Sequence, residues 1–339
     1  MTATGTAGTR RPRTRRDRAD AAQPVPEAEF TSYYGRQVVK PAPWDVRIPL
    51  YMFAGGVAAG SSLLAAGAQL TGRDALVRTG RLGAAGGLAV SLVSLVSDLG
   101  RPERFLNMLR TIKLTSPMSV GTWLLSLYGA PAGVAALDEI VRLLPLAPQS
   151  QTARLVRAVG RPAGVLAGVT APPVAAYTAV LLSDTSTPSW REAYRELPFV
   201  FCASAAASSG GLAMVLTPTG QAGPARRLAA AGAAVELAAE QVMERSMGVT
   251  AEPLHTGKAG RYMRAAKALT AVGGLGALLA GRRRWAAVLS GAALMAGSFC
   301  TRMGVFEAGQ ASARDPKYTV VPQRERLERG EPVRFIPRG

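Results

Sequence analysis

The chain contains eight separate stretches of predominantly apolar residues, and this feature constrains its fold more than any other. Each stretch is about 20 residues long, which is the length that a helix needs to cross the hydrocarbon core of a bilayer. Only helices and closed barrels satisfy every backbone N–H and C=O group inside lipid. Because the stretches lack the period-two alternation of a membrane barrel, the sequence predicts an all-α, polytopic membrane protein with eight transmembrane helices.

The predicted spans are separated by short polar connectors. They cover residues 48–70, 80–98, 119–141, 159–182, 197–216, 225–243, 262–280 and 285–305. An even number of spans places both termini on one side of the membrane, and Arg-rich tails favour the cytoplasm for that side of the cell membrane. The connectors on the opposite side are also basic, for example "GRRR" at 281–284, so this orientation rests on the tails alone.

The two ends of the chain differ from the middle in composition. Residues 1–31 are basic and of low complexity, with "RRPRTRRDRAD" followed by a stretch rich in Pro, Ala and Glu. Such a segment cannot bury enough apolar surface to fold, so we predict that it is disordered. Residues 308–339 are polar again and are predicted to form a C-terminal tail outside the membrane.

The formal net charge of +18 could indicate a nucleic-acid-binding protein. The Arg and Lys residues, however, lie mainly in tails and connectors, where they set topology and contact anionic lipid. No basic patch interleaved with aromatic residues is present, so nucleic acid is not an expected partner. The lipid bilayer is the expected environment.

Cysteine and histidine are too few for the common redox centres. The chain has two cysteines, Cys202 and Cys300, and one histidine, His255. An iron–sulfur cluster usually needs four thiolates, and a membrane cytochrome holds its haem with paired histidines. We therefore expect neither a haem nor an iron–sulfur cluster in this chain, and no metal site.

Ionisable residues inside the predicted spans are candidates for function, because a charge in lipid is costly. Ser91, Ser94 and Asp98 form one polar stripe on the second span, and Asp98 ends that span. Glu236 and Glu240 share one face of the sixth span. The alternative for this pair is an amphipathic helix whose acidic face, including Glu244, meets water or Arg245 at the rim.

Two further features of the spans are interpreted as structural. Gly56 and Gly60 form a pair of small residues that allows two helix backbones to approach closely. Asp138 and Glu139 close the third span beside Arg142, which predicts a salt bridge at the membrane rim.

A mixed-charge connector, "LGRPERFLNMLRTIKLTSPMSVGTW", joins the second and third spans. Its segment "PERFLNMLRTI" fits a short interfacial helix whose apolar side chains enter the membrane boundary. Ser116 or Ser119 is predicted to cap the third helix, with Pro117 in its first turn. Together with residues 43–47, this connector predicts a polar-lined mouth that suits a molecule with an apolar tail and a polar head.

Several long motifs make the chain similar to the NrfD/PsrC family of membrane subunits of polysulfide-reductase-type complexes. They are "YYGRQVVKPAPWDVRIPLYMFAGGVAAGSSLL", "SDLGRPERFLNMLRTIKLTSPMSVGTW", "MGVTAEPLHTGKAGR" and "GVFEAGQASARDPKYTVVPQR", and the resemblance covers residues 32–325. It implies two four-helix bundles, at residues 32–183 and 184–307, with a quinone pocket in the first. It also implies two partners, a ferredoxin-like iron–sulfur subunit and a molybdopterin catalytic subunit like those of polysulfide reductase or formate dehydrogenase.

These implications assign expected roles to the residues singled out above. Asp98 is the candidate to exchange a proton with the head of menaquinone or ubiquinone, and Glu236 and Glu240 are candidates for a proton relay. The residues expected to frame the quinone entrance and the docking surface are Trp44, Asp45, Arg101, Glu103, Arg104, Asn107 and Trp123. The alternative is that these charges only attach the connector to its own helices.

Two other functions remain open at this point. The chain could be a passive anchor that tethers a catalytic partner without quinone chemistry. It could also be a secondary transporter, although the two halves show no internal repeat of the kind that many transporters have.

Overall fold

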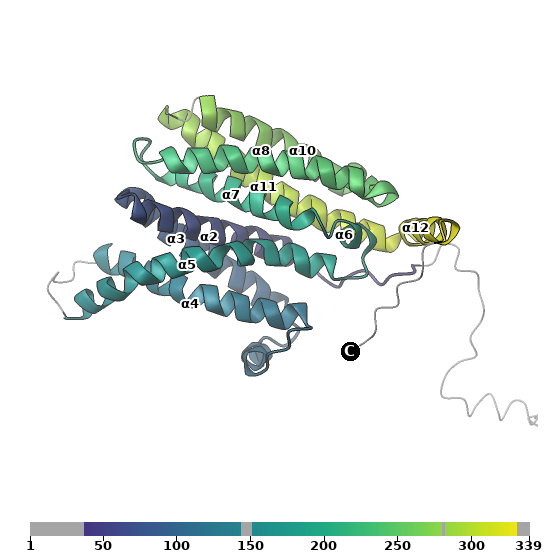
Figure 1. The fold of residues 1–339 in the computed structure, drawn as a ribbon, viewed down its shortest axis with the longest axis horizontal. Coiled ribbons are helices and arrows are strands. Elements are labelled where there is room, and N and C mark those ends of the chain that lie inside the picture. Colours follow the sequence, from purple (N-terminus) through teal and green to yellow (C-terminus); the bar gives the residue numbers. More distant parts are fainter. Residues whose placement is uncertain (1–36, 144–150, 280–281, 331–339) are drawn as a thin grey trace, which may run out of the picture. The chain divides into compact units, whose positions relative to one another are not determined.

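The computed structural model describes residues 37–143, 151–279 and 282–330, and throughout these ranges the regular secondary structure is helical. The prediction of an all-α protein is therefore confirmed. The long helices are α2 (Arg47–Leu70), α3 (Asp74–Asp98), α4 (Pro117–Leu143), α5 (Gln151–Ser183), α7 (Leu197–Leu216), α8 (Gly223–Ser246), α10 (Gly257–Leu279) and α11 (Arg284–Arg314) (Figure 1). The short ones are η1 (Pro102–Arg110), α6 (Pro188–Glu192), η2 (Gly248–Ala251), α9 (Glu252–His255) and α12 (Lys317–Glu328).

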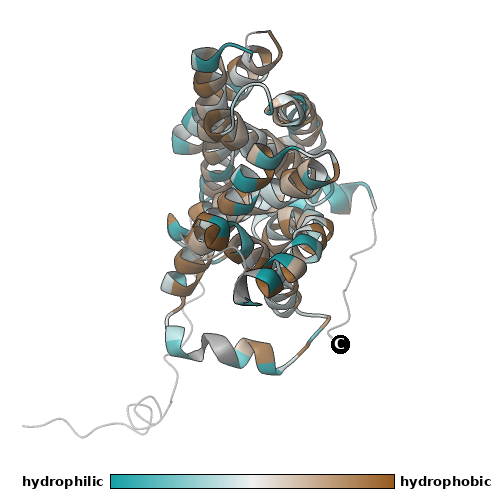
Figure 2. Cartoon of the chain, turned by 90° about the vertical axis from the view of Figure 1, so that its left-hand side faces the viewer, coloured by the Kyte–Doolittle hydropathy of each residue, from teal (hydrophilic) through white to brown (hydrophobic). Residues whose placement is uncertain are grey.

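Among the described helices, six are long and apolar enough to cross a membrane: α2, α3, α4, α5, α7 and α11. Helices α8 and α10 have comparable lengths but are not in this group; α8 carries three arginines and three glutamates, and α10 carries two arginines and two lysines in its first half. Figure 2 looks along the helices and shows hydrophilic residues near their ends and apolar residues on much of their sides. The count of eight spans, the two bundles and the orientation stay predictions.

Helix α2 lies at the centre of the helix packing. It contacts α3, α5, α7 and α11. The predicted close approach at Gly56 and Gly60 is confirmed, because a β carbon on Gly60 would lie 2.8 Å from the carbonyl oxygen of Ala205 on α7. Helices in lipid gain little from the hydrophobic effect, so such backbone contacts supply much of their attraction.

Helix α11 continues nine residues beyond the predicted end of its span at residue 305. The reason is local packing, since this extension is buried against the short helix α6. The indole Nε1 of Trp190 donates a hydrogen bond to the Val305 carbonyl oxygen at 2.8 Å, and the ring lies against Gly309. The polar composition after residue 308 concealed this extension, which buries Ala308, Gly309, Gln310, Ser312 and Ala313.

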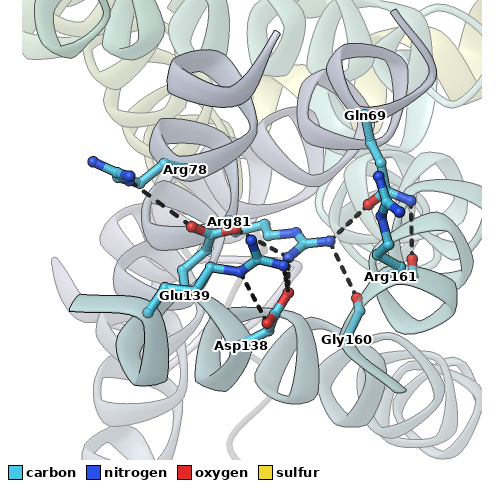
Figure 3. Close-up of polar contacts among 8 residues, drawn as sticks. Gln69, Arg78, Arg81, Asp138, Glu139, Gly160 and Arg161 are labelled. Carbon is cyan, nitrogen blue, oxygen red and sulfur yellow. Dashed lines mark hydrogen bonds and ion pairs between the residues drawn. The ribbon is translucent and has the colours of Figure 1, made fainter. Parts of the chain in front are cut away.

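A buried ion network joins α3, α4 and α5, and α3 itself begins at Asp74, before the predicted residue 80. Arg81 Nη1 donates to Asp138 Oδ2 at 2.7 Å and to Glu139 Oε1 at 3.0 Å. Its Nη2 donates to Gln69 Oε1 at 2.6 Å and to the Gly160 carbonyl oxygen (Figure 3). The positive charge of Arg81, near the start of α3, is therefore paired with carboxylates inside the protein.

The predicted salt bridge between the end of the third span and Arg142 is present. Arg142 Nε does donate to Asp138 Oδ1 at 3.0 Å. The Asp138 side chain, however, is fully buried, and Arg81 is its second partner. Arg81 lies just inside the predicted span 80–98, but no pattern within that segment indicates a partner on α4.

Replacing Arg81 with Met should lower the free energy of unfolding by about 3 kcal/mol, because two buried carboxylates lose their shared partner. The matched control is Arg78→Gln, which removes a half-exposed guanidinium 3.9 Å from Glu139. That change should cost about 1 kcal/mol or less. Thermal and denaturant unfolding of the detergent-solubilised chain would measure both. Equal stability of the two variants would contradict a structural role for the network.

A methyl group at position 60 should also destabilise the fold. Gly60→Ala forces α2 away from the α7 backbone and should cost about 1–3 kcal/mol, as overpacking does. Gly67 is on the same helix, and a β carbon there would meet nothing within 4 Å. Gly67→Ala should therefore be neutral or stabilising by up to about 1 kcal/mol, and the same unfolding measurement would compare the two.

Candidate functional site

A cavity of about 490 Å³ lies where the start of α2, the end of α3, η1, the start of α4 and the end of α5 meet. This end of the helices also carries α6 and α12, on the right in Figure 1. The cavity thus lies next to the connector that joins the second and third spans, where the sequence predicted a mouth. We call it the mouth cavity.

The walls of the mouth cavity are mostly apolar. Leu88, Leu92 and Leu95 line it from one face of α3, because residues three and four positions apart share a helix face. Further apolar side chains come from the other elements: Ile48, Met52, Met108, Met118, Leu125, Leu181 and Leu182. Such walls suit an apolar tail, and pockets of this size commonly hold small organic ligands.

A few polar groups enter the same cavity. Asp98 lines it from the last position of α3, and Tyr51 and Tyr177 line it from α2 and α5. The Tyr177 hydroxyl donates to the Pro117 carbonyl oxygen at 2.6 Å. Gly121 is needed for this arrangement, since a β carbon there would overlap the Tyr177 ring. The Tyr51 hydroxyl makes no hydrogen bond to another described residue, so it is available to a ligand.

The segment before α2 forms one wall and is held from the other half of the chain. Trp44 lines the cavity and stacks on Trp190, with ring centroids 5.8 Å apart. Gln310 Nε2, on the extension of α11, donates to the Ala42 carbonyl oxygen at 2.8 Å. The late part of the chain therefore positions the mouth of a cavity formed by its early part.

Charged residues fix the end of α3 next to Asp98. Arg47 donates from Nη1 to the Ser97 carbonyl oxygen, which links the start of α2 to the end of α3. Asp45 orients this guanidinium through an ion pair of 3.3 Å and accepts a hydrogen bond from the Arg47 backbone N–H at 2.8 Å. The carboxyl group of Asp98 consequently has one cation and one further carboxylate nearby.

A second polar cluster is buried between α7, α8 and α11. Glu236 Oε1 accepts a hydrogen bond from Thr301 Oγ1 at 2.8 Å, and Glu240 is buried one turn further along α8. Arg302 is buried beside them; its Nη2 donates to the Phe201 carbonyl oxygen at 2.9 Å, and its guanidinium lies 3.8 Å from the centroid of the Phe201 ring. Glu244 ends this acidic face and pairs with Lys267 rather than with Arg245.

Several groups of this cluster are incompletely paired. Nε and Nη1 of Arg302 and one carboxylate oxygen each of Glu236 and Glu240 are buried without a hydrogen-bond partner among the described residues. Buried polar atoms are normally satisfied, so the grouping of these exceptions distinguishes the cluster from the rest of the described helix interior. A β carbon on Gly56 would lie 3.5 Å from Arg302, so α2 separates the cluster from the mouth cavity.

Comparison with known protein families shows which family the chain belongs to. Residues 36–243 match the family described as polysulphide reductase, NrfD, which is more than half of the chain. The chain belongs to the NrfD family. Members of this family are membrane subunits of oxidoreductase complexes, so the resemblance is confirmed and the chain is an integral membrane subunit of a respiratory oxidoreductase complex. Among curated proteins, no match to the chain was found.

The NrfD match includes the lining of the mouth cavity and the buried Glu236 and Glu240 of α8. Of the residues expected at the mouth, the structure brings Trp44 and Asp98 together in the cavity lining. Glu103 and Asn107 are exposed on η1, Arg101 is exposed directly before it, and none of the three lines the cavity. The side chain of Arg104 lies outside the described residues.

Trp123 does not line the mouth cavity of this NrfD protein. Its Nε1 donates to the Thr111 carbonyl oxygen at 3.2 Å, so the ring holds the end of the connector on α4. Ser116 precedes α4 as predicted, and its hydroxyl accepts a hydrogen bond of 3.5 Å from the Ser119 backbone N–H.

Three residues of these two sites were not predicted from the sequence. Tyr51 and Tyr177 are isolated in their spans and form no polar stripe with neighbouring residues of the same helix. Each is a tyrosine inside an apolar run, which is a detectable signal because a hydroxyl in lipid seeks a partner. Arg302 lies inside the last predicted span, and a charge there was equally visible in the sequence.

Proposed function

We propose that this NrfD protein passes electrons between a membrane quinone and an iron–sulfur subunit, with the quinone head in the mouth cavity. The observation that carries the proposal is an apolar cavity of about 490 Å³ with one carboxyl group and two tyrosines at its polar positions. Menaquinone and ubiquinone both combine a long apolar tail with a ring whose oxygens accept hydrogen bonds. The leucines of α3 would contact the tail, and Tyr51 would donate to a ring oxygen.

The partner subunits in this proposal dock on the face that carries η1. Arg101, Glu103 and Asn107 are exposed there, a few residues from the cavity lining at Met108. Exposed charges of both signs can pair with a complementary surface and fix its orientation. An iron–sulfur subunit bound to this face lies close to the quinone head and connects it to a molybdopterin catalytic subunit.

Helices α8 and α10 also cross the membrane in this proposal, which completes eight spans in two bundles with both termini on the cytoplasmic side. At about 1.5 Å per residue, their 24 and 23 residues exceed the thickness of the hydrocarbon core. The acidic residues Glu236 and Glu240 are buried against other helices rather than exposed to lipid. The basic residues of α10 occupy its first half, where long side chains can reach the membrane surface.

Asp98 exchanges the protons that accompany the electrons. It lies in the cavity lining at the membrane-surface end of α3, so its carboxyl group can contact both a bound ring oxygen and water. General acid–base catalysis requires such a group within hydrogen-bond reach of the reacting oxygen. Arg47 and Asp45 hold the end of α3 that presents it.

The test is an Asp98→Asn variant of the assembled complex. We expect the complex to assemble and its soluble catalytic activity to survive, while electron transfer to quinone falls at least about tenfold, because the amide cannot exchange the proton. The control is Asp184→Asn, an exposed carboxylate in the connector after α5 that lines no cavity. Normal quinone turnover in the Asp98 variant would make this residue structural, and loss of assembly would assign it to docking.

Glu236 and Glu240 relay protons within the protein in the same proposal. They lie one turn apart on α8, each with a carboxylate oxygen that lacks a partner among the described residues, and Glu244 continues the line to the end of the helix. A Glu236→Gln/Glu240→Gln variant should retain the fold and lose proton uptake coupled to quinone turnover by at least about tenfold. Proteoliposomes with a pH-sensitive dye would measure the uptake, with the exposed Glu325→Gln as control. Unchanged coupling would make the pair structural.

A further inference from the structure

A second large cavity lies at the opposite end of the helices from the mouth cavity, and the proposed electron transfer does not use it. It has a volume of about 640 Å³ and is enclosed by the end of α2, the start of α3, the end of α4 and the start of α5. In Figure 1 this end is on the left, where α2 finishes and α5 begins. We call it the basic cavity, because its charged lining consists of Asp74, Arg78, Arg81, Glu139, Arg142, Arg157 and Arg161.

Five arginines face only two carboxylates in this lining, and the ion pairs are unevenly distributed. Arg81 and Arg142 are engaged by the buried Asp138 and, for Arg81, by Glu139 as well. Arg78 lies 3.9 Å from Glu139, at the outer limit of an ion pair. The carboxylates of the network are thus already shared among three guanidinium groups.

Arg157 and Arg161 are left with positive charge and no acidic partner. Neither makes an ion pair with any described residue, and Nε of Arg157 is buried without a hydrogen-bond partner among them. The two residues lie four positions apart on α5, so both project from one face of the helix. The α5 backbone at Arg161 is held next to α2, because Gln69 Nε2 donates to the Arg161 carbonyl oxygen at 3.1 Å.

Two like charges at this spacing repel each other unless an anion lies between them. A guanidinium group presents its N–H donors in a planar fork that matches the oxygens of a phosphate group. The membrane supplies such an anion at this depth, since the cavity is formed where the spans end. Exposed leucines flank it at Leu70, Leu143 and Leu155, and these can contact acyl chains.

We propose that the basic cavity binds the phosphate group of one anionic phospholipid. Arg157 and Arg161 bind the phosphate oxygens, and Arg78 borders the same space. The Arg81 network forms the floor and keeps α3, α4 and α5 at a fixed separation. The lipid is then a structural ligand at the face of the membrane opposite to the quinone site, in line with the basic pockets between membrane helices that bind anionic headgroups.

The test uses the purified full chain in mild detergent and native mass spectrometry. The probe is phosphatidylglycerol, and phosphatidylcholine with the same acyl chains is the zwitterionic comparison. We expect the wild-type chain to retain one phosphatidylglycerol and to bind phosphatidylcholine much more weakly. An Arg157→Gln/Arg161→Gln variant should bind phosphatidylglycerol at least about tenfold more weakly, because it lacks the two unpaired charges.

Two matched variants keep this test specific. Arg226→Gln/Arg227→Gln removes two arginines at the same end of the helices but outside the basic cavity, and it should bind phosphatidylglycerol as the wild type does. Arg157→Lys/Arg161→Lys keeps the charge without the planar fork and should bind with intermediate affinity. Circular dichroism and thermal unfolding in detergent would verify that every variant is folded.

Three results would overturn the proposal. The first is equal retention of phosphatidylglycerol by the wild type and by the folded Gln variant. The second is equal binding of phosphatidylcholine by the wild-type chain. The third is thermal stabilisation by inorganic phosphate that equals stabilisation by phosphatidylglycerol and is lost in the same variant, since it would identify a soluble anion as the ligand.

Discussion

The close approach of α2, α7 and α11 at small residues is the contact on which the rest of the structure depends. Gly60 of α2 lies against α7 at Ser209, and Gly211 of α7 lies against Gly291 of α11. In lipid, helices associate through van der Waals contact and buried hydrogen bonds rather than through apolar burial. Contacts among these three helices therefore fix where the other helices that line the mouth cavity and the acidic cluster can pack.

The chain contains two buried groups of charges that are built differently. Around Arg81, two carboxylates, an amide and a backbone carbonyl oxygen accept from Nη1 and Nη2, so the charge is compensated although Nε has no partner among the described residues. Around Arg302, one backbone carbonyl oxygen accepts a hydrogen bond, and nearby carboxylate oxygens are unpaired. A compensated group links helices, whereas the proposed proton relay involves the incompletely paired group.

The extension of α11 explains how the two halves of the chain combine at one site. Trp190 lies between Trp44 and Phe306, and Gln310 holds the backbone at Ala42. The first wall of the mouth cavity is therefore attached to the last long helix. Changes in the late part of the chain would move Trp44 and thereby affect a cavity whose other walls come from α2 to α5.

Hydropathy along the sequence was sufficient to predict an all-helical membrane protein and to place the long helices, and α7 has the predicted limits of 197–216. The motifs around Asp98 were long enough to identify the NrfD family. These features are local, because a run of apolar residues or a turn signal acts within its own segment. The same local signals also placed Asp98 at a helix end beside the connector.

Only the tertiary structure decided which side chains meet. Tyr51 and Tyr177 join Asp98 in one cavity because of how α2 and α5 are rotated about their axes, and small contacts such as Gly121 against Tyr177 fix that rotation. Arg81 meets Asp138 for the same reason, although the two residues are 57 positions apart in the chain. Helix rotation and separation depend on contacts between residues far apart in the chain, and no pattern within one segment contains that information.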